Sequence, residues 1–173
     1  ELLEDATEDA IERVEAGKRR AAAHAAETFE DGETILTHDY SSTVLEAIES
    51  ACADGTRLTA YVTEARPRYL GRKTARTLAG IDRVEPHLVV DSAAGHVMPE
   101  CDRVVVGMDC IVEGTLYNRI GTYPIAAVAA REDVPVTVVG SSTKVIDEFR
   151  FENEFRAPSE VMREPVEGVE IEN

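Results

Sequence analysis

Four short apolar runs in this chain each end on an acidic residue. β-Branched residues are common in the runs, which is typical of strands. The carboxyl ends of parallel strands meet at one edge of a sheet, and open α/β folds bind their ligands at that edge. The pattern therefore predicts a pocket surrounded by carboxylates. The runs cover residues 34–38, 58–63, 87–90 and 104–108, and the acids that follow them are Asp39, Glu64, Asp91 and Asp109.

Segments with helical periodicity separate these runs. In 41–53, Val44, Leu45 and Ile48 repeat at helical spacing, and a serine at 41 or 42 can cap the start. Strands that alternate with helices in this way indicate right-handed crossovers and a parallel sheet with helices on both faces, so the predicted fold class is α/β with a leading helix. Helices are expected at 1–29, 41–53, around 70–78, near 92–98 and at 122–131. Strands are expected at 35–37, 58–63, 88–90, 103–106 and 134–139, the last of them central, with a small excursion at 111–116.

Composition divides the chain into three regions. Residues 1–31 are expected to be the end of an N-terminal helical region, residues 32–150 the sheet-containing domain, and residues 151–173 an acidic tail. The tail contains two prolines and little periodicity, so we expect it to pack on the domain or on a neighbouring subunit. At 173 residues the chain has the size of one ordinary domain, and because Glu1 falls inside the first helix we expect a piece of a longer protein.

Acidic residues dominate the charge, since 34 Asp and Glu against 18 Lys and Arg give a net charge of −16. Binding to a phosphate backbone requires clustered cations, so no nucleic-acid partner is expected. An acidic surface whose only lysines are Lys18, Lys73 and Lys144 resembles those of proteins from salt-loving archaea. No apolar run approaches the roughly 18 residues of a membrane span, and no charged-then-apolar leader opens the chain, so we expect a cytoplasmic protein with no membrane partner.

Neither the cysteines nor the histidines have the spacing of a metal site. Cys52, Cys101 and Cys110 are odd in number and form no CxxC motif, which favours buried, reduced thiols. The four histidines are scattered, and His38 is expected to pack or hydrogen-bond at the end of its strand. The sequence therefore predicts no metal and no cofactor.

The segment Asn118-Arg119-Ile120-Gly121-Thr122 immediately precedes a predicted helix. Backbone N–H groups of the helix start, its positive dipole end and the Arg119 guanidinium would converge there, which is typical of an anion site. The alternative is that Gly121 only relieves a tight turn that Asn118 caps. The sequence leaves both interpretations open.

The acids at the strand ends also have a structural alternative. Each could cap the helix that follows its strand, and Asp39 and Asp91 fit that role well. Asp109 fits it poorly, because Cys110, Ile111 and Val112 continue as an apolar run with no helix to cap. Asp109 therefore needs a different explanation.

Several sequence blocks resemble a known family. They are ILTHDYSSTVLEAIESA, YVTEARPRYLGRKTA, VVDSAAGHVM and VVVGMDCIVEGTLYNRIGTYPIAAVAA, in order between about residues 33 and 157. Together they resemble the translation initiation factor 2B alpha/beta/delta subunit family, whose superfamily also contains methylthioribose-1-phosphate isomerase and archaeal ribose-1,5-bisphosphate isomerase. The resemblance implies a Rossmann-like domain, a helical N-terminal domain that is mostly absent here, association as a homodimer or higher homo-oligomer, and an initiation factor 2 subunit as a partner.

The resemblance also implies that two positions decide whether the chain is an isomerase. The sugar-phosphate isomerases have a cysteine at the position of Asp39, and it works with the aspartate at the position of Asp109 to move hydrogen between C1 and C2 of the sugar. A thiol has a pKa of about 8.5, whereas a carboxylic acid starts at about 4 and would be a second anion facing Asp109. Two close carboxylates can instead share a proton and act as an acid–base dyad.

Other positions carry the ligand-binding part of the resemblance. Asn118 matches the substrate-binding asparagine of the isomerases, and Arg119 replaces the lysine that follows it. Leu70 replaces an expected glutamine, although Arg66 and Pro67 keep the surrounding motif. A phosphate-binding loop of the isomerases would lie before Glu1.

The sequence leaves two hypotheses about function. In the one that we favour, the chain is a non-catalytic, initiation factor 2B-like regulatory or scaffold subunit whose pocket is vestigial or senses a phosphorylated sugar or nucleotide, because the departures from the isomerase pattern fall on reacting positions. In the alternative, it is a divergent aldose–ketose sugar-phosphate isomerase in which Asp39 and Asp109 are catalytic. The predicted ligand-binding residues are Asn118, Arg119, Gly121, Thr122, Arg66, Glu64 and Asp91.

Overall fold

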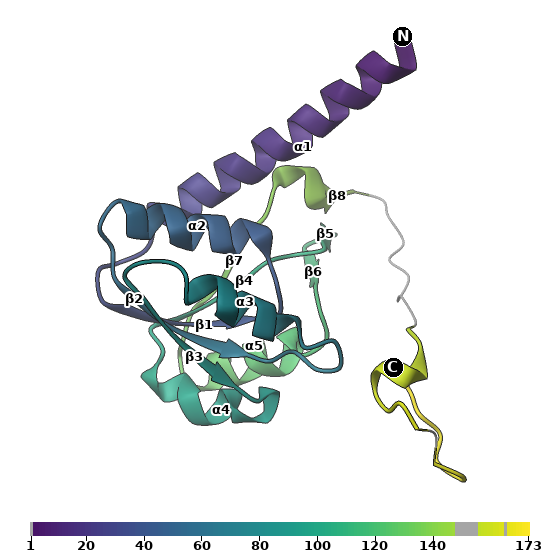
Figure 1. Ribbon diagram of the computed structural model, residues 1–173. Coiled ribbons are helices and arrows are strands. Elements are labelled where there is room, and N and C mark those ends of the chain that lie inside the picture. Colours follow the sequence, from purple (N-terminus) through teal and green to yellow (C-terminus); the bar gives the residue numbers. More distant parts are fainter. Residues whose placement is uncertain (1, 148–155, 165) are drawn as a thin grey trace.

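A parallel sheet forms the centre of the molecule (Figure 1). The computed structural model describes residues 2–147, 156–164 and 166–173, and the side chains from residue 7 onward. In these residues the five-stranded sheet has the order β3-β2-β1-β4-β7, and every neighbouring pair is parallel. The strands are β1 (Glu33–His38), β2 (Leu58–Thr63), β3 (Val84–Val89), β4 (Arg103–Val106) and β7 (Val136–Val138).

Helices cover both faces of this sheet (Figure 1). One face carries α1 (Leu2–Ala26), α2 (Ser42–Ala53) and α3 (Leu70–Leu78), and the other carries α4 (Ala94–Val97) and α5 (Thr122–Arg131). Because side chains alternate along a strand, Ile35 packs into the first layer and Leu36 into the second, and both are fully buried. Strand β4 is buried on both faces, which explains its run of three valines. The predicted α/β fold is confirmed.

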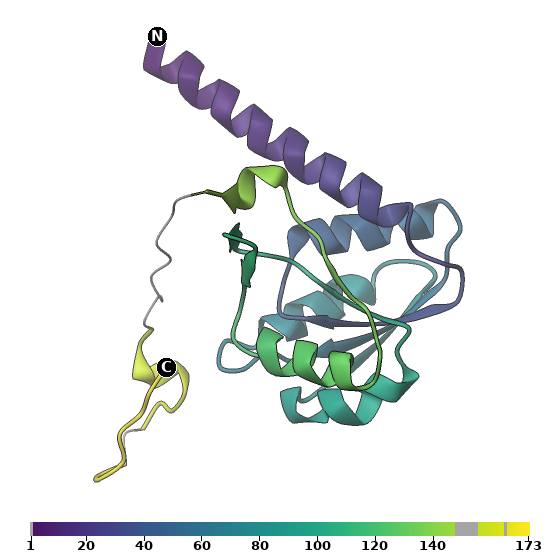
Figure 2. The same ribbon diagram turned by 180° about the vertical axis from the view of Figure 1, so that it is seen from behind.

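Helix α1 has one end packed on α2 and the other extended away from the sheet (Figure 2). Its buried side chains, Ala22 and Ala25, lie in the last turns, whereas Ile11 and Val14 are exposed. The helix ends at Ala26, three residues before the predicted end at residue 29. The following turn is closed by the Thr28 hydroxyl, which donates to the Ala25 carbonyl over 2.7 Å.

A second, three-stranded sheet lies beside the carboxyl end of β4 (Figure 1). Strands β5 (Cys110–Val112) and β6 (Thr115–Tyr117) form an antiparallel hairpin, and β8 (Val145–Ile146), which follows the 3-10 turn η3 (Ser142–Lys144), adds in parallel to β5. The hairpin turn is Glu113-Gly114, with φ values of 49° and 77°, as a two-residue type I′ turn requires. This hairpin is the excursion that the sequence predicts at 111–116.

Two strand predictions need correction. The strand predicted at 88–90 begins at Val84 and contains Pro86, which is tolerated because β3 is at the edge of the sheet. The strand predicted at 134–139 as central is β7 at the opposite edge, because the chain returns to β1 and adds β4 and then β7 on its other side. Hydrophobic periodicity does not encode this reversal of strand order.

The C-terminal region is irregular, with a 3-10 turn η4 (Pro158–Glu160), shown in yellow in Figure 1. Arg66 Nη2 donates to the Val161 carbonyl over 2.9 Å, so this region contacts the sheet-containing part of the chain. Residues 151–155 and 165 of the predicted tail lie outside the described residues. The three-region division of the chain stays a prediction.

Candidate active site

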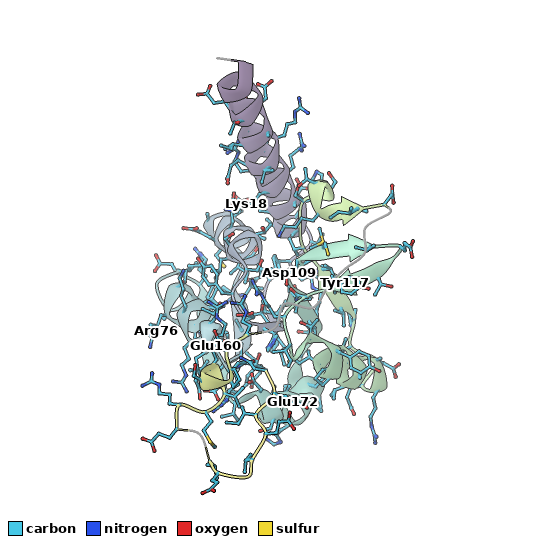
Figure 3. All side chains as sticks on the ribbon, turned by 90° about the vertical axis from the view of Figure 1, so that its right-hand side faces the viewer. Lys18, Arg76, Asp109, Tyr117, Glu160 and Glu172 are labelled. Atoms are coloured by element: carbon cyan, nitrogen blue, oxygen red, sulfur yellow. The ribbon has the colours of Figure 1, made fainter. Side chains whose placement is uncertain are left out.

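The reversal of strand order places a cavity at the carboxyl ends of β1 and β4. Such switch points are where open α/β sheets bind ligands. The cavity measures about 990 Å³, and Figure 3 views the molecule from this side, with Asp109, Tyr117 and Glu160 labelled. Its walls come from the end of β1, the loop before α3, the β5–β6 hairpin and the start of α5, and the C-terminal region. The side chains that the sequence analysis singled out on these walls are Asp39, Arg66, Asp109, Asn118, Arg119, Gly121 and Thr122.

Two carboxylates meet at one guanidinium in this cavity. Arg119 Nε lies 3.5 Å from Asp39 Oδ2 and 3.7 Å from Asp109 Oδ2. The Asp39 side chain is 9% exposed, whereas those of Asp109 and Arg119 are 45% and 41% exposed. The two acids therefore share a cation and face one cavity, one from inside and one from its open side.

The Asp39 carboxyl is held in an unfavourable environment. Its Oδ1 is buried and has no hydrogen-bond partner. Burial raises the pKa of Asp39, and the negative charge of Asp109 adds to this, although the nearby His38 and Arg119 side chains oppose it. The backbone is left-handed, with φ of 63°, and the buried Thr74 hydroxyl donates to the Asp39 carbonyl over 2.6 Å. Asp39 is thus fixed in place and retains a proton to higher pH than an ordinary aspartate.

Hydrogen bonds within the loop shape the segment 118–122. Asn118 Nδ2 donates to Thr122 Oγ1 over 3.1 Å, and that hydroxyl donates to the Arg119 carbonyl over 2.7 Å. Gly121 precedes α5 with φ of 99°, and no side chain caps the helix. The Asn118 side chain is therefore not a backbone cap, and the start of α5 faces the cavity next to Arg119.

The hairpin brings the two ends of this site together. The Asp109 N–H donates to the Tyr117 carbonyl over 3.0 Å, so Asp109 and Asn118 lie across the base of the β5–β6 ladder. Lys144 Nζ donates to the Met108 carbonyl over 2.8 Å, directly before Asp109. The sequence analysis did not select Lys144, and its only signal there is that lysine is rare in this chain.

Two predicted ligand-binding acids lie outside the cavity. Glu64 pairs with Arg72, with Oε2 2.7 Å from Nη2. The two carboxylate oxygens of Asp91 accept the backbone N–H groups of Ala65 and Arg66 over 2.8 and 2.7 Å. All four acids follow strand ends, but Glu64 and Asp91 are occupied by these contacts, and the cavity receives Asp39 and Asp109 instead.

The described residues contain no group of three or more His, Cys, Asp or Glu side chains that could hold a metal ion. Within the same part of the chain, no helix combines the length and apolar character needed to cross a membrane. The three cysteines are buried and unpaired. The cavity is lined by carboxyl, guanidinium, amide and hydroxyl groups.

Residues 1–173 match the family model described as the initiation factor 2 subunit family. The chain belongs to this family. Over 121 residues it is 40% identical to the ribose 1,5-bisphosphate isomerase of Haloterrigena turkmenica. The matched residues make up 69% of this chain and 37% of the relative.

Solved structures of the family have the same fold. The chain resembles the crystal structure of translation initiation factor eIF-2B, subunit delta, from A. fulgidus, with a TM-score of 0.81 at 26% identity over 90% of this chain and 51% of that one. It also resembles 5-methylthioribose 1-phosphate isomerase from Pyrococcus horikoshii, with a TM-score of 0.78 at 26% identity over 89% and 48% of the two chains.

These family relatives correct the functional hypothesis that the sequence analysis favoured. Six curated relatives at 33–40% identity are named ribose 1,5-bisphosphate isomerase. The preference for a non-catalytic subunit is therefore wrong, and the isomerase alternative is favoured. The chain spans between 37% and 52% of the length of these relatives.

Proposed function

We propose that the full protein is an aldose–ketose isomerase that acts on a phosphorylated pentose of the ribose 1,5-bisphosphate type. The observation that carries the proposal is the pair Asp39 and Asp109 around Arg119, at the wall of a cavity, with the pKa of Asp39 raised by burial. The names of the relatives supply the substrate class.

The reaction needs one group that gives a proton and one that accepts it. In the cyclic aldose the bond between C1 and the ring oxygen breaks, and that oxygen takes a proton. Hydrogen moves from C2 to C1 with its bonding electron pair, and the C2 hydroxyl loses its proton to become the ketone, so atoms and electrons balance. Asp39, whose pKa is raised by burial, is the donor to the ring oxygen, and Asp109 accepts the proton of the C2 hydroxyl.

The raised pKa also explains how a carboxyl can work at a position where the resemblance implies a thiol. An exposed aspartate is almost fully ionised at neutral pH and is a poor acid there. Desolvation of Asp39 opposes ionisation and moves its pKa toward the range of a useful general acid. The substitution therefore changes the proton donor and preserves the reaction type.

The charges around the cavity suit a phosphorylated ligand. The chain carries a net charge of −16, yet four arginines line this cavity together with three acids. Arg119, Asn118 and the start of α5 form one phosphate site, because a helix N-terminus with a nearby guanidinium favours an anion. The arginines are Arg66, Arg68, Arg119 and Arg156, and the acids are Asp39, Asp109 and Glu160.

Turnover by the full-length protein tests the proposal. Ribose 1,5-bisphosphate and 5-methylthioribose 1-phosphate are supplied separately, and the ketose product is measured. Asp109→Asn and Asp39→Asn are expected to lower kcat by roughly 100-fold or more, because each removes a proton-transfer group. Asp39→Cys, which introduces the thiol that the resemblance implies, is expected to retain turnover.

Asp82→Asn is the matched control, because Asp82 is an exposed acid before β3, at the opposite edge of the sheet. It should leave turnover unchanged. A full-length protein that converts neither sugar, or an Asp109→Asn variant with wild-type kcat, would refute the proposal.

We also propose that the full protein forms a homo-oligomer. Val136 and Val138 are exposed on edge strand β7, and Leu88 and Val90 are exposed at the end of edge strand β3, which leaves apolar surface at both sides of the sheet. Sedimentation of the full-length protein tests this, and a monomer at micromolar concentration would contradict it.

A further inference from the structure

His38 joins the sheet to the loop that carries Arg119. Its side chain is at the end of β1 and is 3% exposed. Nδ1 lies 2.6 Å from the Thr63 hydroxyl on β2, and Nε2 lies 2.6 Å from the Ile120 carbonyl. The imidazole therefore spans from two neighbouring strands to the segment 118–122.

The direction of these hydrogen bonds follows from the partners. A carbonyl oxygen only accepts, so Nε2 carries the hydrogen and donates to Ile120. Thr63 Oγ1 lies 2.6 Å from His38 Nδ1 and donates to the Thr37 carbonyl over 3.4 Å. Because Thr63 is fully buried, protein groups alone hold both ring nitrogens.

Gly121 allows the ring to approach the loop this closely. A Cβ atom at this position would lie 2.6 Å from His38 Nε2. The backbone φ of 99° is also one that residues with a side chain rarely adopt. The imidazole thus packs against the backbone of Gly121 while it binds the carbonyl of Ile120. These two contacts fix the peptide that joins Arg119 to the start of α5.

We propose that His38 is a positioning residue of the candidate active site. By holding the Ile120 carbonyl, it keeps the Arg119 guanidinium between Asp39 and Asp109 and keeps the start of α5 directed at the cavity. His38 does not line the cavity itself, so it acts through the loop and touches no ligand. The inference rests on the proposed function for its effect on turnover, but its effect on the loop does not depend on which reaction occurs there.

The test compares three variants of the full-length protein. His38→Ala removes both hydrogen bonds, His38→Gln restores an amide N–H that can reach the Ile120 carbonyl, and His24→Ala makes the same chemical change at an exposed site on α1. Binding of inorganic phosphate is measured by calorimetry, and exchange of the amide hydrogens of residues 119–123 is measured by NMR, below the unfolding temperature of every variant.

His38→Ala should weaken phosphate binding by roughly 10-fold or more and speed exchange in the loop, since a buried acceptor loses its donor. His38→Gln should recover most of both effects, and His24→Ala should show neither. Turnover of ribose 1,5-bisphosphate should fall as well. The effect on kcat should be larger than the effect on KM, because Arg119 no longer holds the two acids. The nitrogen NMR shifts of the wild-type ring should report hydrogen on Nε2.

A histidine that only stabilises the fold gives a different pattern. His38→Ala would then lower the melting temperature while the folded variant bound phosphate and exchanged loop amides like the wild type, and this result would overturn the proposal. If His38→Ala does not fold, the comparison of His38→Gln with the wild type decides between the two roles of His38. Retention of the loop protection in His38→Gln, with hydrogen on Nε2 in the wild type, supports the inference, and a wild-type ring without hydrogen on Nε2 refutes it. A wild type without isomerase turnover but with a His38-dependent loop would refute the proposed function alone.

Discussion

Asp39→Asn should make the protein more stable and less active. In the wild type, Oδ1 of Asp39 is buried without a hydrogen-bond partner, which costs roughly 1–3 kcal/mol for a polar group. The partly exposed Arg119, with Nε 3.5 Å from Oδ2, recovers at most about 1 kcal/mol. An uncharged amide of the same shape avoids the cost of burying charge, so we expect the variant to gain about 1 kcal/mol at pH 7, or about 2–4 °C in Tm.

The pH dependence separates this explanation from a general packing effect. Because the folded protein raises the pKa of Asp39 above 3.8, it binds the proton more tightly than the unfolded chain does. The stability of the wild type therefore falls as pH rises through the interval between the unfolded and the folded pKa. The variant lacks this loss, so its advantage should be present at neutral pH and disappear as pH falls toward 3.8.

Urea unfolding of the full-length protein between pH 4 and 8, followed by circular dichroism, measures this difference. Asp109→Asn is the matched control, because Asp109 contacts the same guanidinium but is half exposed, and its free energy of unfolding should change by less than about 0.5 kcal/mol. Two results would show that Asp39 is not held in a costly charged state. One is an Asp39→Asn variant that is less stable than the wild type at pH 7, and the other is a difference in the free energy of unfolding that is the same at every pH.

Three further predictions concern other parts of the fold. Gly71→Ala should cost about 3 kcal/mol or more in urea unfolding, because its methyl group would meet the backbone carbonyl at the end of β2; Gly80→Ala, which has room, should change stability little. The Asp31 carboxyl should titrate by NMR at about 2, because the guanidinium and the backbone N–H of Arg57 both donate to it; Arg57→Ala keeps the backbone bond and should raise the pKa part of the way toward 3.8, and an unchanged titration would contradict the role of the guanidinium. Cys101, whose pKa is raised to about 11 by burial and by neighbouring acids, should resist iodoacetamide at pH 8 until urea unfolds the protein, and rapid labelling of the native protein would count against its burial.

The local sequence pattern was sufficient to predict the bounds of a helix or strand where the residues of that element alone specify them. Leu58–Thr63, Leu70–Leu78, Arg103–Val106 and Thr122–Arg131 have the predicted bounds, because alternation, helical spacing, or a glycine or proline at the correct end specifies each of them. The position of β7 at the edge was not predicted, because strand order depends on how layers pack and leaves no periodic signal.

The candidate site shows the same limit more sharply. Asp39, Glu64, Asp91 and Asp109 have equivalent positions in the sequence, yet Glu64 finds Arg72 and Asp91 finds two backbone N–H groups. Which acid is left with an unpartnered oxygen depends on contacts between segments far apart in the chain. The preference for a non-catalytic protein rested on departures from the isomerase pattern at reacting positions, Asp39 among them, and the burial of Asp39 was not visible in the sequence.

The β5–β6 hairpin builds part of the site from one short segment of the chain. Residues 109–118 form one short ladder closed by a two-residue turn, so Asp109 and Asn118 are brought together by local chain closure, which costs little entropy. His38 belongs instead to strand β1 of the central sheet, and Asp39 directly follows that strand. Lengthening or shortening this hairpin would therefore alter the spacing between the outer carboxylate and the amide without disturbing the inner acid, and an enzyme engineer could vary substrate size through ten contiguous residues.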